Sequence, residues 1–147
     1  MIKREILIML CFAWFIKNAQ AESAPGLVDG HLKNCPGSPN CVNSEQDDIE
    51  PIAFGDLSSD EAWQKLQQAI SGEGGELKSV SGDYLWAIFK TPMLRFTDDV
   101  EARLDSGNRQ IHLRSASRVG YSDFGTNRRR LEAIKNRYQR LSKTADR

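Results

Sequence analysis

The sequence predicts an α+β domain in which two packed helices cover an antiparallel sheet of about five strands, in the order β-α-β-β-β-β-α. Three observations lead to this fold class. One segment that begins at Ser58 and another that ends at Leu141 repeat apolar residues every three or four positions, as amphipathic helices do. The segments between them alternate with period two, as half-buried strands do. The turns between those strands are short, which favours antiparallel neighbours.

The N-terminal segment, residues 1–21, is typical of a secretory signal peptide. Two basic residues precede an apolar run over 6–16, and Ala19-Gln20-Ala21 follows as a small-residue cleavage site. The run is too short to span a bilayer, which argues against the alternative of an uncleaved anchor. We therefore expect an exported, periplasmic protein that begins at Glu22 and contacts the membrane only through the signal segment before cleavage.

Charge is unevenly distributed along the chain. Lys and Arg number 20 in total, as do Asp and Glu, but residues 118–147 hold 9 basic and 3 acidic side chains. Such asymmetry can mark a surface for nucleic acid or for a membrane. Because export makes nucleic acid an unsuitable partner, we expect the acidic part of the chain to neutralise the basic part internally.

Residues 22–48 are rich in Pro, Gly, Ser, Asn and Asp, which predicts an irregular leader before a single domain over 49–147. Cys35 and Cys41 form an isolated pair around a turn-forming string, and an exported protein would oxidise them to a disulfide. The alternatives are a redox pair or a metal site. Five intervening residues do not fit a redox motif, and His31 alone could add a ligand. We expect no metal and no cofactor.

The elements of the domain follow from capping, periodicity and turn residues. A short apolar run at 49–54 predicts the first strand. Ser58 and Glu61 form a capping box that opens the first helix, and the glycines that begin at Gly72 end it. Period-two alternation then predicts strands at 76–80, 84–91, 94–104 and 110–117, and the final helix starts at Asp123 or Thr126.

The 94–104 strand carries an unusual group of acids. Its alternation places Leu94 and Asp98 on the same, apolar face, whereas Asp99 and Glu101 face the other way. A buried carboxylate is costly unless it is paired or hydrogen-bonded. Asp98 is therefore expected to have a partner.

Arginines are concentrated on the two elements that follow. Arg114 and Arg118 face away from the apolar side of the 110–117 strand, and the final helix begins with the consecutive arginines 128–130. Cations in the first helical turn are disfavoured by roughly 0.3–1 kcal/mol each, so something negative should compensate them. At helical spacing Asn127 falls on the apolar stripe, the first and third of these arginines flank it, and the second points to solvent.

These acids and arginines suggest one polar network, for which three functions are open. An anionic small molecule or envelope component could bind to arginine forks and helix-terminal N–H groups. A hydrolase-type enzyme could use Asp99 or Glu101 as general base with an arginine that stabilises an oxyanion. A structural or partner-binding domain would use the charges as ion pairs. The candidate site residues are Asp98, Asp99, Glu101, Arg114, Arg118, Asp123, Asn127, Arg128 and Arg130.

Three motifs together resemble the family known as domain of unknown function 1499. They are Cys35-Pro-Gly-Ser-Pro-Asn-Cys41, Phe96-Thr-Asp98-Asp99-Val-Glu101, and the segment from Arg114 to Arg130 that contains Gly120-Tyr-Ser-Asp123-Phe-Gly125-Thr-Asn127. The resemblance covers roughly residues 35–141. It implies no activity, and it supports the treatment of the acid and arginine motifs as one site.

Overall fold

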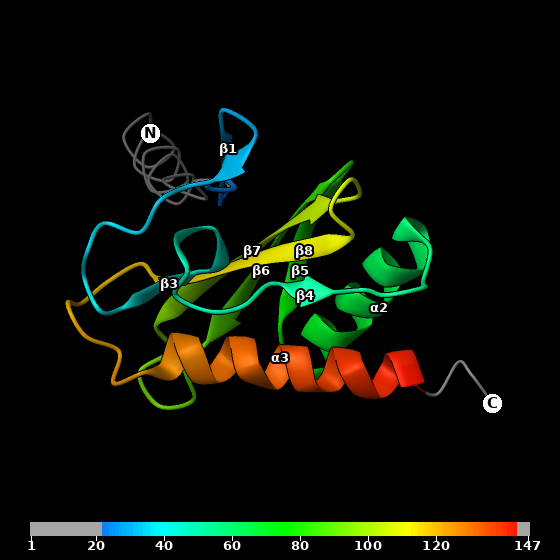
Figure 1. Ribbon diagram of the computed structural model, residues 1–147. Helices are drawn as coiled ribbons and strands as arrows, with labels where there is room; N and C mark the ends of the chain where they lie inside the picture. The colour runs from blue at the N-terminus through cyan, green and yellow to red at the C-terminus, as the bar shows by residue number, and fades with distance from the viewer. Residues whose placement is uncertain (1–21, 144–147) are drawn as a thin grey trace, which may run out of the picture.

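The computed structural model describes residues 22–143 (Figure 1). The predicted signal peptide, residues 1–21, lies outside the described residues, so export stays a prediction. Within the described part of the chain, neither of the α-helices has the length and apolar character needed to cross a membrane.

A six-stranded antiparallel sheet forms the centre of the molecule, as the α+β prediction required. Its strand order is β3-β8-β7-β6-β5, and β4 pairs with β8 beyond the end of β3. Next to it, β1 (Leu27–Val28) and β2 (His31–Leu32) form a separate hairpin. The strands of the main sheet are β3 (Cys41–Asn43), β4 (Ile52–Ala53), β5 (Glu76–Ser81), β6 (Tyr84–Lys90), β7 (Thr97–Asp105) and β8 (Gln110–Ser117).

Two α-helices, α2 (Ser59–Gly72) and α3 (Thr126–Lys143), pack against each other and against one face of this sheet (Figure 1). The capping box is confirmed: the N–H of Glu61 donates to Ser58, and the Glu61 carboxylate accepts from the N–H of Ser58. Both helices bury their apolar stripes as predicted. The core between helices and sheet includes Trp63, Leu66, Ile70, Leu85, Ala87, Phe89, Val100, Ala102, Ile111, Leu113, Leu131, Ile134 and Tyr138.

The segment 22–48 is more ordered than its composition indicated. Its last part adds β3 to the sheet and continues into a short 3-10 helix, η1 (Ser44–Gln46). The Glu45 carboxylate fixes it by accepting from the N–H of Leu32 and from Arg103 of β7. These are tertiary contacts, which periodicity within the segment cannot reveal. The predicted disulfide between Cys35 and Cys41 is present, with a Cα–Cα distance of 5.6 Å.

The prediction that a strand begins at Leu94 is wrong, and so is the placement of Leu94 on its apolar face. Residues 91–96 form the β6–β7 loop, in which Leu94 is 70% and Phe96 is 47% exposed. The loop is closed by the N–H of Thr91, which donates to the carbonyl of Phe96, and by a left-handed residue at Arg95. The predicted first strand at 49–54 is likewise reduced to the two residues of β4.

Candidate functional site

Asp98 is buried on the helix-facing side of β7, with 2% of its surface exposed. Nη2 of Arg130, in the second turn of α3, donates to Asp98 Oδ2 at 2.6 Å. The same guanidinium lies over the Phe89 ring, 4.8 Å from its centroid. The predicted partner of the buried carboxylate is therefore an arginine of the final helix, and the pair joins α3 to the centre of the sheet.

Asn127 completes the contact between α3 and the sheet. It is fully buried, as its position on the apolar stripe predicted. Its Nδ2 donates to the carbonyl of Asn40 at 2.9 Å, to Ser117 Oγ at 2.9 Å and to Asp123 Oδ2 at 2.7 Å. The hydroxyl of Ser115 donates to its Oδ1. One amide therefore fastens together β8, α3, the segment before α3 and the disulfide loop.

Asn40, inside the Cys35–Cys41 loop, extends this network to the segment between β8 and α3. Its carbonyl accepts from the N–H of Ser117 at 3.0 Å, and its Nδ2 donates to the carbonyl of Gly120 at 2.6 Å. We call residues 118–125 the β8–α3 loop. Its position depends on the disulfide loop, which lies far from it in sequence.

Asp123 supplies the negative charge at the start of α3. Its carboxylate accepts from the N–H of Gly125 at 2.9 Å and from the N–H of Asn127 at 2.7 Å. Burial alone would raise the pKa of Asp123, but these hydrogen bonds outweigh it and lower the pKa below its ordinary value. Because the helix-terminal N–H groups already bind a carboxylate, they are poorly placed to receive an external anion.

Glu101 lies on the opposite face of the sheet and has no exposed surface. It accepts from the hydroxyl of Tyr84 at 2.8 Å and from Nη1 of Arg114 at 2.6 Å. Burial raises the pKa of Glu101, and the charge of Arg114 offsets that rise only in part. The Glu101 carboxylate is thus held inside the protein by two donors, one of which is a cation.

Asp99 is also buried on that opposite face. Its carboxylate accepts from Trp86 Nε1 at 2.8 Å and from Arg118, whose Nε and Nη2 donate at 2.9 and 2.8 Å. Arg118 binds Glu22 as well, at 3.1 Å. Asp99 and Glu101 are therefore covered and paired, which gives the hydrolase hypothesis no support.

The structure divides the predicted single network between the two faces of the sheet. Asp98 lies under α3, which carries Asn127 and Arg130, whereas the acids and arginines of the other face lie under the segment 22–48. Alternation along β7 separates neighbouring acids because successive side chains point to opposite sides. The one-site expectation therefore needs correction. The candidate acids form ion pairs on both faces of the sheet, with Asp98 on one face and Asp99 and Glu101 on the other.

The first two arginines of α3 have other contacts. Arg128 is exposed, and its Nη1 donates to the carbonyl of Asp48 at 2.6 Å. Arg129 is exposed and donates to the carbonyl of Phe124 at 2.8 Å. Neither forms an ion pair with a described residue. Of the two arginines expected to flank the stripe, one is thus held by an acid and the other is not.

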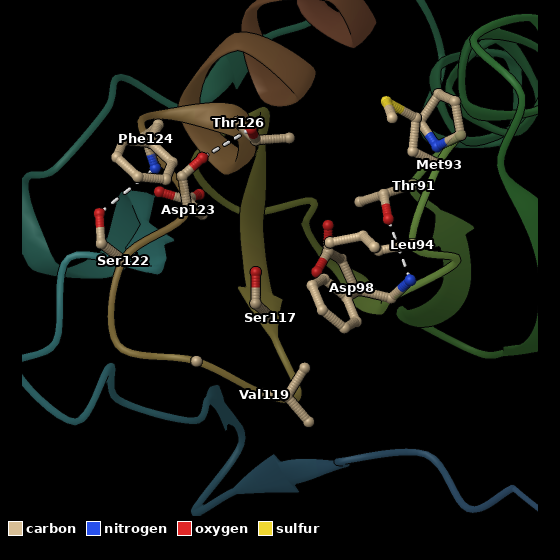
Figure 2. Close-up of a pocket in the computed structure, with 13 residues that line it drawn as sticks. Thr91, Met93, Leu94, Asp98, Ser117, Val119, Ser122, Asp123, Phe124 and Thr126 are labelled. Atoms are coloured by element: carbon tan, nitrogen blue, oxygen red, sulfur yellow. Dashed lines mark hydrogen bonds between the residues drawn. The ribbon is translucent and has the colours of Figure 1, made fainter.

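A pocket of about 790 Å³ opens between the β6–β7 loop and the β8–α3 loop (Figure 2). Asp98 and Ser117 lie at its floor, with the apolar side chains of the two loops on either side. Its lining residues are Thr91, Pro92, Met93, Leu94, Phe96, Asp98, Ser117, Val119, Gly120, Ser122, Asp123, Phe124 and Thr126. Of the predicted site residues, it contains only Asp98 and Asp123.

The apolar wall of this pocket was missed by the sequence reasoning. The signal was available at Thr91-Pro92, since a proline that ends a strand can begin a loop, and apolar residues inside a loop have no sheet face to occupy. Among the described residues, no group of three or more His, Cys, Asp or Glu side chains is placed to hold a metal ion.

The chain belongs to a family described as "Protein of unknown function (DUF1499)", whose model matches residues 31–137. The match confirms the resemblance inferred from the cysteine, acid and arginine motifs. No curated protein matches the chain in sequence.

Replacement of Arg130 by alanine should strongly destabilise the domain, because it leaves the buried Asp98 carboxylate without its cation. We expect a loss of about 3–5 kcal/mol in the free energy of unfolding. Denaturant unfolding measures it, and Arg129→Ala, which removes an exposed arginine from the neighbouring position, is the control. A similar loss in both variants would contradict the assigned pairing.

Asp123→Asn should weaken the start of α3 by about 1 kcal/mol at neutral pH, since a carboxylate that accepts two N–H groups is replaced by an amide. Because the pKa of Asp123 is lowered on folding, its contribution is present above the ordinary value of 3.8 and is lost as the pH falls through the lowered pKa. The difference in unfolding free energy between wild type and variant should therefore be constant near neutrality and shrink in acid. A difference that grows below pH 3.8 would refute this role.

Proposed function

We propose that this chain is an exported binding domain that holds the apolar part of an envelope molecule in the pocket between the β6–β7 and β8–α3 loops. The observation that carries the proposal is the pocket itself, with its volume of about 790 Å³ and its predominantly apolar walls. Pockets for small molecules commonly measure about 300–1,000 Å³ and combine apolar walls with a few polar groups.

The floor of the pocket favours a neutral hydrogen-bond donor at the inner end of the ligand. Asp98 and Ser117 present oxygen atoms there. Arg130 already neutralises Asp98, so a cationic ligand gains little. An anionic head group would approach two carboxylates, those of Asp98 and Asp123, without a free cation. A hydroxyl or an amide N–H attached to an apolar chain fits this floor best.

The arginines do not carry this proposal, because three of the candidates face carboxylates. Arg114, Arg118 and Arg130 each form an ion pair shorter than 3 Å. Their main contribution is to structure: they hold β7, β8 and α3 in register around buried acids.

A second candidate function, a site for a small anion, is favoured by Arg128 alone. This exposed guanidinium lines a smaller, more polar cavity of about 430 Å³ beside the disulfide loop, together with Gly37, Ser38 and Gln46. The backbone carbonyl of Asp48 accepts a hydrogen bond from Arg128, but the Asp48 carboxylate forms no ion pair with it. The arrangement leaves donors of the guanidinium available to an anion.

The apolar site is tested with decanol as a neutral probe and decanoate as its anionic counterpart, by isothermal titration calorimetry. We expect decanol to bind more tightly than decanoate and with a negative heat-capacity change. Phe96→Ser should raise the dissociation constant for decanol about tenfold, because roughly 1.5 kcal/mol of apolar contact is lost. Val80→Ser is the matched control, since Val80 is 44% and Phe96 47% exposed. Absence of decanol binding to the wild type would refute the proposal.

Inorganic phosphate tests the anion site. If phosphate binds at Arg128, ten times its dissociation constant should stabilise the wild type by about 1.4 kcal/mol and leave Arg128→Ala unaffected. Arg129→Ala should respond as the wild type does. Thermal melts with and without phosphate measure the effect, and equal shifts in wild type and Arg128→Ala would eliminate this candidate.

A further inference from the structure

The rim of the apolar pocket exposes large apolar side chains on both of its loops. Met93 is 92% exposed on the β6–β7 loop, and Phe124 is 89% exposed on the β8–α3 loop. Leu94 and Val119, which also line the pocket, accompany them. Single exposed apolar residues are ordinary, but a cluster around one opening marks an interaction surface. We call these four side chains the apolar rim.

Hydrogen bonds that involve the backbone fix the conformation of the two loops that carry the apolar rim. Phe124 has a left-handed backbone with φ of 52°, a conformation that costs an L-residue free energy. Its N–H donates to Ser122 Oγ at 3.3 Å and its carbonyl accepts from Arg129. In the other loop Arg95, with φ of 51°, donates its N–H to the carbonyl of Thr91 at 3.0 Å. The projection of both loops is therefore built into the fold.

Cations lie beside the apolar rim and are not neutralised. Arg95 belongs to the β6–β7 loop, and Arg129 lies at the base of the β8–α3 loop. Both are exposed, and neither forms an ion pair within the described part of the chain. The acids of the same region, Asp98 and Asp123, are already bound to Arg130 and to backbone N–H groups. The end of the molecule that carries the pocket mouth is thus apolar and positively charged.

We propose that the apolar rim docks on the surface of an anionic lipid bilayer, with Arg95 and Arg129 at the level of the lipid phosphates. Apolar side chains flanked by basic residues are the composition with which proteins enter a membrane interface. A protein partner fits less well, because a stable interface buries roughly 800 Å² of continuous surface on each side. Here the mouth of the pocket interrupts the surface between the two loops, so the surface that a protein partner would cover is not continuous. Lipid chains can fill such an opening.

Docking in this orientation turns the pocket mouth toward the bilayer. An apolar ligand could then pass between membrane and pocket without crossing water, and this last step rests on the proposed function. The docking itself does not, because it depends on the apolar rim and the two arginines rather than on the interior of the pocket.

The test uses the chain that starts at Glu22, which contains the whole described fold, and sedimentation with vesicles. Binding is expected to mixed phosphatidylcholine–phosphatidylglycerol vesicles and to be much weaker to phosphatidylcholine alone. Met93→Ser combined with Phe124→Ser should lower the partition coefficient at least about tenfold. Arg95→Ser should lower it about fivefold for mixed vesicles only. Val28→Ser with Val80→Ser, and Lys33→Ser, are controls that remove exposed apolar side chains or a cation elsewhere.

Failure of the wild type to bind mixed vesicles, or equal binding by the Met93/Phe124 variant, would overturn the docking proposal. Phe96→Ser separates the two proposals: it should lose decanol affinity and keep vesicle binding. Vesicle binding by a wild type that takes up no decanol would refute the ligand pocket and leave the docking surface standing.

Discussion

The buried ion pair between Asp98 and Arg130 is the constraint on which the rest of this structure depends. A carboxylate on the core side of a strand is costly unless it is paired or hydrogen-bonded, and the cation that pairs with Asp98 comes from the helix that packs there. The pair accordingly fixes where the first turns of α3 lie on the sheet. Once α3 is placed, Asn127 reaches the disulfide loop and Asp123 reaches the helix-terminal N–H groups. One buried acid of β7 thus joins the sheet to the second turn of α3.

The same strand shows how alternation distributes charge. Asp98 binds its arginine on the helix side of the sheet. Asp99 and Glu101 bind theirs on the side covered by the segment 22–48. β7 is therefore pinned on both faces by arginines of other elements. Such a central strand has little freedom to tilt or slide, so the β6–β7 loop ends at a fixed strand and the β8–α3 loop begins beside it. The pocket inherits its shape from these two fixed ends.

Local signals predicted the parts of the fold that local physics decides. The capping box at Ser58 and Glu61, the burial of Asp98 and the burial of Asn127 all follow from spacing along one element. The predictions for the segment 22–48 and for the β6–β7 loop were wrong for a different reason. Contacts such as that between Glu45 and Arg103 join residues far apart in sequence, and a stretch of alternating apolar residues does not say where its strand begins. The pocket is made from two such loops, and of its lining residues only Asp98 and Asp123 were among the predicted site residues.

The contacts of Asn40 connect the disulfide loop to the wall of the pocket. This residue sits between the two cysteines, and it holds both the end of β8 and Gly120 of the pocket wall. A chain in which Cys35 and Cys41 are still reduced lacks the constraint that limits the freedom of Asn40. The disulfide between Cys35 and Cys41 therefore restrains the residue that holds Gly120 in the pocket wall, so it supports the pocket as well as the N-terminal segment.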